Sequence, residues 1–285
     1  MGTEPATSSD GAATRSIDVP GTPPARQDPY DPYRRALHGL NAVEAPFLVG
    51  GTWAFAQYTG IARPTKDLDL FVTRQGRDRV LEALRALGWE THVAFPHWLA
   101  KARQGSHCLD VIHGAGNGVA MVDDEWFQHA RPSRVLGVRT RLVPAEEMIW
   151  SKAFVMEKYR YDGADVAHLI LRQGKALDWK RLLRRFGRHW RVLLAHLVLF
   201  EFIYPGRHVV PDSLLASFAR KAARENAEGP GRVVCRGVLL SRKQYRVDTE
   251  SWGLRDARLD SDVAMSPEDI LDWTLADPGK PGPDA

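Results

Sequence analysis

Residues 47–72, FLVGGTWAFAQYTGIARPTKDLDLFV, contain the pattern that decides the fold. The apolar run that ends at Val49 predicts a short buried strand, and the Gly-Gly-Thr at residues 50–52 begins a helix that Gly60 ends. Residues 67–72 then alternate acidic and apolar side chains at first, which predicts a second strand. A strand, a glycine turn, a helix and a second strand in this order indicate an α/β arrangement.

Asp67 and Asp69 lie on one face of the second predicted strand, because successive side chains point to opposite faces, whereas Leu68 and Leu70 face a core. Two carboxylates this close repel each other, so the pKa of one rises unless a positive charge lies between them. Magnesium prefers oxygen ligands and commonly takes one or two carboxylates, with phosphates and water as its other ligands. The pair therefore predicts a magnesium site.

Gly50, Gly51 and Thr52 lie between the first strand and the helix, where backbone N–H groups can approach an anion and the helix N-terminus adds partial positive charge. A glycine pair is also typical of a simple tight turn. With Asp-Leu-Asp beginning fifteen residues after Thr52, the combination favours a nucleotide site with a phosphate cradle beside a metal-binding pair.

These positions resemble the polymerase-β-like nucleotidyltransferase superfamily, over roughly residues 40–170. Its pattern is a hydrophobic strand, Gly-Gly or Gly-Ser, a helix, Asp-x-Asp and a third carboxylate on a later strand. Asp110 in HCLDVIHG matches the third carboxylate. Asp123 and Asp124 compete for that assignment, although Asp-Asp-Glu before a tryptophan is more typical of a helix start.

The resemblance is closest to small bacterial subgroups that include antibiotic nucleotidyltransferases and toxin-type members. In these groups a helix after the sheet carries a lysine, and a later segment contains Arg, Asp, two residues and Asp. Lys152, Arg160, Asp162 and Asp165 match those positions. Asp162 is equally suited to cap the following helix, Asp165 is as readily a structural residue, and Lys152 is suited to a solvated helix face.

The chemistry implied by the resemblance is in-line attack of an acceptor hydroxyl on the α-phosphorus of an NTP, with release of pyrophosphate. Two magnesium ions stabilise the attacking and leaving oxygens in reactions of this type. The resemblance implies Asp67 and Asp69 as ligands of both ions, Asp110 as ligand of one ion and acceptor of the proton, Gly50, Gly51 and Thr52 as phosphate-binding residues, and Arg63 or Lys152 as residues that neutralise phosphate charge.

The acceptor expected from this reading is a small molecule that carries a hydroxyl. One alternative is a toxin-like enzyme that acts on tRNA or protein, because Lys180, Arg184, Arg188 and Arg191 recur at helical spacing. A solvated face of an amphipathic helix explains the same spacing and is favoured. The other alternative is a non-catalytic nucleotide-binding module, which the presence of all three carboxylates disfavours.

The composition is that of an ordinary globular protein of 285 residues, 44% hydrophobic and 26% charged. The first 29 residues lack the apolar core of a signal peptide. The longest apolar run, residues 192–204, is too short for a membrane span and contains His196 and Glu201. Only two cysteines are present, which fits a reducing compartment. We therefore expect a cytoplasmic protein without a membrane partner.

The fold class expected is α/β (α+β), a mixed sheet with flanking helices followed by a mainly helical part. Three adjacent strands are expected at residues 90–95, 98–103 and 107–112, and a helix over 144–159. The expected organisation is a disordered segment 1–29, a nucleotidyltransferase core 30–143, a helical domain 144–230, and a segment 231–285 with a hairpin over 232–247 and an acidic disordered tail.

Overall fold

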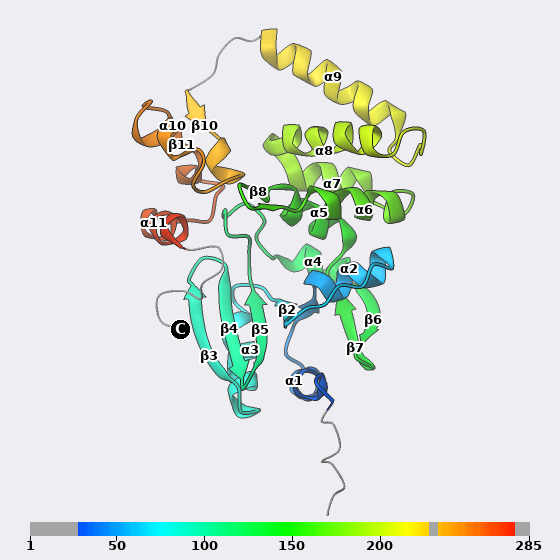
Figure 1. Ribbon diagram of the computed structural model, residues 1–285, viewed down its shortest axis with the longest axis vertical. Helices are drawn as coiled ribbons and strands as arrows, with labels where there is room; N and C mark the ends of the chain where they lie inside the picture. The colour runs from blue at the N-terminus through cyan, green and yellow to red at the C-terminus, as the bar shows by residue number, and fades with distance from the viewer. Residues whose placement is uncertain (1–27, 228–232, 277–285) are drawn as a thin grey trace, which may run out of the picture.

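The computed structural model describes residues 28–227 and 233–276, and its central element is a seven-stranded mixed sheet (Figure 1). Strand β2 runs parallel to β5 and β1 runs parallel to β7, whereas the other neighbours are antiparallel. In spatial order the strands are β3 (Glu90–Phe95), β4 (Leu99–Gln104), β5 (His107–Ile112), β2 (Asp67–Phe71), β1 (Leu48–Val49), β7 (Val138–Leu142) and β6 (Arg131–Val135). The mixed sheet predicted from the sequence is confirmed. All but the last two residues of the predicted disordered segment 1–29 lie outside the described residues.

One face of the sheet is apolar and belongs to the core. Leu68 and Leu70 of β2 and the adjacent Leu109 of β5 are fully buried on this face. Helices α1 (Asp31–Ala42) and α3 (Arg77–Ala86) pack against each other, and they contact β7 and β3 respectively. The polar residues that alternate with the buried ones therefore lie on the opposite face of the sheet.

Five consecutive α-helices follow the sheet and form the upper part of the molecule in Figure 1. They are α5 (Ala145–Ala153), α6 (Gly163–Gln173), α7 (Trp179–Phe186), α8 (Trp190–Ile203) and α9 (Asp212–Ala227). Helix α2 (Gly51–Thr59) contacts both β2 and α6, so it connects the sheet to these helices. The predicted helical region is confirmed. Within the two described ranges, every helix falls short of the length and apolar character that crossing a bilayer requires.

The hairpin of β6 and β7 was not predicted from the sequence. Its turn is formed by Leu136 and Gly137, which both have positive φ angles, of 52° and 82°. Two successive residues with positive φ are typical of the two-residue turns that join antiparallel strands. The hydrophobic alternation of Val138 and Leu142 is a strand signal, but the polar first strand, Arg131–Val135, hides the pair.

The helix predicted over residues 144–159 is wrong in its second half. Helix α5 ends at Ala153, and the two short strands β8 (Met156–Glu157) and β9 (Arg160–Tyr161) follow. The backbone N–H of Met156 donates to the carbonyl oxygen of Leu240 at 3.1 Å, so a segment distant in sequence binds the chain at this point. That long-range contact has no local sequence signal.

The C-terminal segment also differs from the prediction. Strand β10 (Val234–Cys235) pairs in parallel with β11 (Arg255–Asp256), so the hairpin expected over residues 232–247 is wrong. A short helix, α10 (Arg246–Glu250), lies between the two strands. Helix α11 (Pro267–Leu275) was not predicted, and only its last two residues fall in the last dozen residues, which were expected to be disordered. Residues 277–285 lie outside the described part of the chain.

Aromatic contacts attach α11 to the turn between β3 and β4. The ring of Trp273 makes edge contacts with Phe95 and Trp98, at centroid distances of 5.3 and 5.2 Å. Beside them, Nδ1 of His97 lies 3.3 Å from Oδ1 of Asp269. Aromatic pairs of this kind stabilise by roughly 0.5–1.5 kcal/mol beyond the area they bury. The C-terminal segment therefore packs on the same edge of the sheet that carries β3 and β4.

Candidate active site

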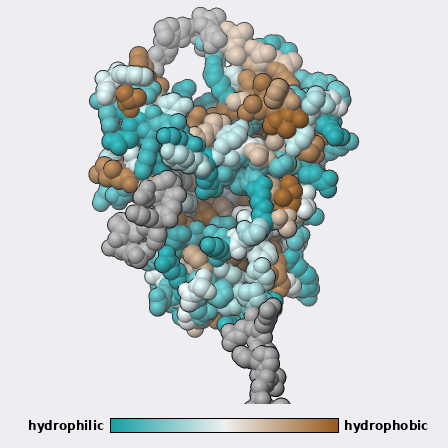
Figure 2. Space-filling view, in the orientation of Figure 1, coloured by the Kyte–Doolittle hydropathy of each residue, from teal (hydrophilic) through white to brown (hydrophobic). Residues whose placement is uncertain are grey.

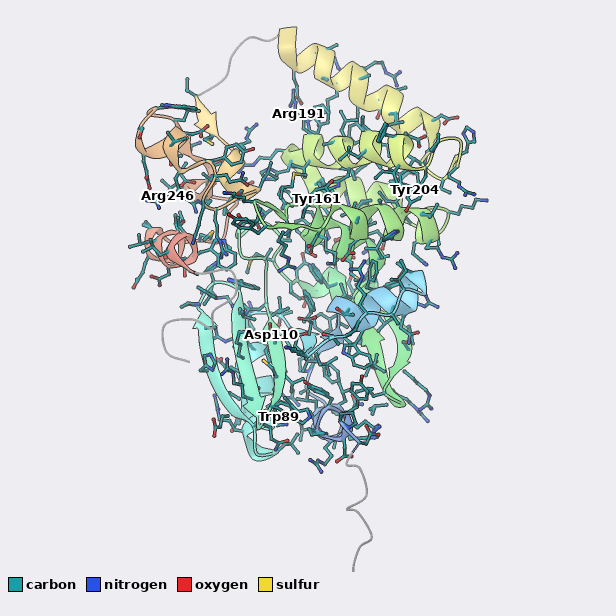
Figure 3. All side chains as sticks on the ribbon, in the orientation of Figure 1. Trp89, Asp110, Tyr161, Arg191, Tyr204 and Arg246 are labelled. Atoms are coloured by element: carbon teal, nitrogen blue, oxygen red, sulfur yellow. The ribbon has the colours of Figure 1, made fainter. Side chains whose placement is uncertain are left out.

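The three predicted carboxylates lie on one face of two adjacent strands. Strands β2 and β5 are parallel, and Asp69 pairs with Asp110 in register. Asp67 lies two residues before Asp69, so it shares their face. All three side chains are half-buried. Figure 3 shows Asp110 on β5, below the labelled Tyr161. The structure thus brings together the acids that the sequence predicted.

Gly51 lies directly over the carboxylate of Asp69. Its backbone φ of 51° is in the left-handed region, and a Cβ added there would lie 1.5 Å from Oδ2 of Asp69. At Gly50, an added Cβ would lie 2.2 Å from the ring of Phe71. The backbone N–H of Gly50 also donates to the carbonyl oxygen of Asp69, at 3.0 Å. Both glycines are therefore required for the turn to approach β2 so closely.

The N-terminus of α2 begins at this turn, with Thr52 half-buried in its first turn. Neither Gly50 as N-cap residue nor the residues of the first helical turn provide an acidic side chain at this end. The first N–H groups of a helix have no partner within the helix, so they are suited to bind an anion such as a phosphate. The turn thus places a helix end that is suited to an anion beside the face that carries the three carboxylates.

The surroundings of Asp69 perturb its carboxyl group. Burial raises its pKa, and the charges of Asp67 and Asp110 raise it further, to about 7. Lys152 and Arg160 act in the opposite direction. A carboxyl group that is half-protonated near neutral pH indicates a cluster whose negative charge is not balanced by the protein alone. A bound cation would restore the ionised form of Asp69.

The other two acids have hydrogen-bond partners. Oδ1 of Asp67 accepts from the hydroxyl of Thr65 at 2.6 Å. Oδ1 of Asp110 lies 2.7 Å from Nζ of Lys101, and the thiol of Cys108 is 3.6 Å from the same oxygen. Across residues 28–227 and 233–276, no three His, Cys, Asp or Glu side chains are arranged closely enough to hold a metal ion. The donor set nevertheless suits magnesium, because three carboxylates share one face and the charges of Asp67 and Asp110 raise the pKa of Asp69.

Lys152 and the arginines predicted around it form a second cluster. Nζ of Lys152, near the end of α5, lies 2.9 Å from both Asp162 and Asp165. Arg63 binds Asp165 at 2.7 Å, and Arg160 binds Asp162 at 3.1 Å. Burial raises the pKa of Asp162, but hydrogen bonds from Arg160 and the charge of Lys152 lower it below its ordinary value overall. Asp162 therefore stays ionised and holds Lys152 and Arg160, whose charges act on Asp69.

The capping role considered for Asp162 is not what the structure shows. Asp162 occupies the N-cap position of α6, but its side chain makes no capping hydrogen bond. Its carboxylate binds Lys152 and Arg160 instead. By contrast, Asp123 accepts a hydrogen bond from the backbone N–H of Glu125 and caps α4 (Asp124–Gln128). The reading of Asp123 and Asp124 as a helix start is confirmed.

Lys101 was not predicted from the sequence as a residue of the site. It pairs with Asp110 in the antiparallel register of β4 and β5, and its side chain is 20% exposed. A signal was present, because Gln104 pairs with His107 across a two-residue turn and this turn fixes every other pair of the hairpin. That register places Lys101 opposite Asp110, the third carboxylate.

The predicted basic stripe, formed by Lys180, Arg184, Arg188 and Arg191, is exposed, as the solvated-face interpretation expected. Arg181 is 4% exposed and binds Glu147 at 2.7 Å, and Arg185 binds Glu147 at 3.0 Å. Arg188 and Arg191 pair with acids of other segments. Arg181 and Arg185 lie beside the stripe on α7 and pack against α5 instead. Ion pairs therefore neutralise Arg188 and Arg191 of the stripe.

Comparison with known proteins gives one family. A family model described as an uncharacterised nucleotidyltransferase matches residues 36–199, a range that contains the sheet, the three carboxylates and the Lys152 cluster. No curated protein matches the chain.

Solved structures show a distant likeness. The solution structure of the antibiotic-resistance factor ANT(2'')-Ia is 18% identical, with 69% of this chain and 95% of that chain covered and a TM-score of 0.37. The lincomycin-bound lincosamide antibiotic adenylyltransferase LnuA is 15% identical, with 48% and 94% covered and a TM-score of 0.36. JHP933 from Helicobacter pylori is 13% identical, with 69% and 94% covered and a TM-score of 0.33.

Proposed function

The chain belongs to the uncharacterised nucleotidyltransferase family, and we propose that it transfers a nucleoside monophosphate from an NTP to a hydroxyl group of an acceptor. The observation that carries this proposal is the position of Asp69. It lies between Asp67 and Asp110 on one face of the sheet, directly under the glycine turn that begins α2. A nucleotide bound there has its phosphates at a helix N-terminus and its α-phosphorus near three carboxylates.

The residues that would hold magnesium are Asp67, Asp69 and Asp110. Bound magnesium would supply positive charge that stabilises the oxygens of the attacking and leaving groups. The raised pKa of Asp69 supports this assignment, because it reflects burial and the repulsion of two neighbouring carboxylates. We propose two ions, with Asp67 and Asp69 as ligands of both and Asp110 as ligand of the one nearer the acceptor.

In the proposed reaction, the acceptor oxygen forms a bond to the α-phosphorus, and the bond from that phosphorus to the pyrophosphate oxygen breaks. Asp110 takes the proton of the acceptor hydroxyl. Its contacts with Lys101 and Cys108 both use Oδ1, so Oδ2 is the oxygen that the acceptor can approach. The pyrophosphate leaves with the electron pair of the broken bond.

The nucleotide's charge is offset by residues on the other side of the site. Gly50, Gly51 and the hydroxyl of Thr52 would bind the terminal phosphates at the start of α2. Lys152 and Arg63 would neutralise phosphate charge, and both are held by Asp165. An ammonium group that already has two carboxylate partners is fixed in place before the substrate arrives, which is what electrostatic stabilisation of a transition state requires.

The test is label transfer from each α-labelled NTP, with magnesium and a panel of aminoglycosides, lincosamides, sugar phosphates and tRNA as acceptors. Label on an acceptor and release of pyrophosphate are expected for the wild type. Both should fall by on the order of 10²-fold or more in the Asp67→Asn/Asp69→Asn variant. Asp124→Asn, an exposed aspartate at the start of α4, is the matched control and should keep full activity. A folded wild type that shows no magnesium-dependent NTP binding in calorimetry would refute the proposal.

A further inference from the structure

A row of charged side chains crosses the sheet from the carboxylates toward its edge. Asp69 of β2 pairs with Asp110 of β5, and Asp110 pairs with Lys101 of β4. Arg103 lies two residues after Lys101 and pairs with Cys108. Because residues two apart on a strand share a face, Lys101 and Arg103 lie on the same face as the three acids, ~7 Å apart along β4.

The orientation of these two cations is fixed by the core. Ala100 and Ala102, which alternate with them on β4, are fully buried on the opposite face. Nζ of Lys101 lies 2.7 Å from Oδ1 of Asp110. Arg103 is half-buried and has no ion pair with any acid of the residues that the structure describes. Glu90 of β3 pairs with Arg103 in register without forming an ion pair with it, so the guanidinium of Arg103 can meet an anion beside Lys101.

Lys101 and Arg103 lie on the side of the carboxylates away from the glycine turn, where the proposed reaction would place the acceptor. The glycine turn follows β1, and β2 and β5 separate β1 from β4 in the sheet. The phosphate cradle and the two cations are thus on opposite sides of the carboxylates. On the face shown in Figure 2, hydrophilic side chains predominate over the part where Figure 1 places β3, β4 and β5, and brown side chains gather over the helical half.

We propose that Lys101 and Arg103 form an acceptor subsite that binds a phosphate group of the molecule whose hydroxyl is modified. The inference rests on the proposed function and narrows its acceptor to a phosphate ester with a hydroxyl group, either a sugar phosphate or the 3' end of an RNA. Arginine matches phosphate geometry with two parallel hydrogen bonds, and lysine binds it as a point charge. A polycationic acceptor would meet two like charges next to Asp110, which disfavours it.

The experiment compares binding of three probes by calorimetry in the presence of magnesium: ribose 5-phosphate, a six-nucleotide RNA with a free 3'-hydroxyl, and ribose. The wild-type chain should bind at least one of the two phosphorylated probes and should not bind ribose. Arg103→Gln should weaken that binding on the order of tenfold to a hundredfold, as expected for loss of hydrogen bonds to a charged group. Arg207→Gln, an exposed arginine in the loop after α8, is the control and should bind as the wild type does.

Which probe binds distinguishes a small sugar phosphate from an RNA end as the acceptor. The proposal is refuted if neither phosphorylated probe binds the wild type, or if Arg103→Gln binds them equally well. Label transfer to aminoglycosides or to unphosphorylated sugars alone would also refute it, while leaving the nucleotidyltransferase function intact. NTP binding is measured separately on the same three proteins and should be equal in all of them. Its absence in all three would contradict the proposed function and not the subsite, which is tested by the probes.

Discussion

Replacing Asp69 by asparagine should make the protein more stable at neutral and alkaline pH. The pKa of Asp69 is raised from 3.8 to about 7, first by burial and then by the charges of Asp67 and Asp110. The native state therefore holds this proton more tightly than the unfolded state does. Its free energy of unfolding falls as pH rises from about 4 to about 7, and the loss is complete above that range.

The magnitude follows from the two pKa values. A rise from 3.8 to about 7 corresponds to roughly 4 kcal/mol when the group is fully ionised. Asp69 is half-buried, and water around it screens part of this repulsion, so we expect about 2–4 kcal/mol at pH 8. Asparagine cannot ionise and has nearly the same shape, so the Asp69→Asn variant avoids this destabilisation. The advantage of the variant should grow with pH and disappear near pH 4.

Urea denaturation of both proteins at several pH values, in buffer with a chelator, measures the difference in the free energy of unfolding. The gap should increase by about 2 kcal/mol between pH 5 and pH 8. Asp124→Asn, at an exposed position, should show no such trend. Magnesium at pH 8 should stabilise the wild type and have a much smaller effect on Asp69→Asn, because the cation relieves the same repulsion. If the variant were less stable than the wild type at pH 8, the reasoning about the cluster would be wrong.

Three further substitutions test other parts of the structure. Gly51→Ala places a Cβ 1.5 Å from Oδ2 of Asp69 and should reduce label transfer on the order of 10²-fold or more. The control is Gly60→Ala, whose Cβ meets no atom within 4 Å and which should leave label transfer nearly unchanged. Equal activity of the two variants would contradict the close approach of Gly51 to Asp69. Arg181→Met removes the partner of buried carboxylates and should lower the free energy of unfolding by about 3–5 kcal/mol in urea, and an unchanged midpoint would refute this. Trp273→Ala removes the aromatic contacts of α11, so limited trypsin digestion should release C-terminal fragments faster than from the wild type; unchanged protection would show that other contacts hold the segment.

The part of the fold around the carboxylates was predictable because its signals are local. The alternation in Asp67–Phe71 fixes which side chains share a face, and Gly51 marks the turn above them. The hairpin of β6 and β7 was missed because its first strand, Arg131–Val135, has mostly exposed and half-buried polar side chains. The parallel pairing of β10 with β11 was missed because the two strands are separated by nineteen residues that contain a helix.

The candidate site also has one part that the sequence predicts and one part that it does not. The acids on β2 and β5 depend on strand periodicity and on the parallel register of two strands, and a two-residue turn at Gly105 would have given Lys101 as well.

The cations on the helices depend on how those helices pack. Arg63 follows α2, Lys152 lies on α5 and Asp165 lies on α6, and the three meet only because α2 and α5 both pack against α6. No spacing in the sequence specifies that meeting. The resemblance to a known family found Lys152 and Asp165, but it did not show that one carboxylate holds both Lys152 and Arg63. That shared partner has a consequence: Asp165→Asn should release both cations together, so it should weaken NTP binding more than Arg63→Gln alone, and calorimetry of the two variants would show the reverse order if each cation were held independently.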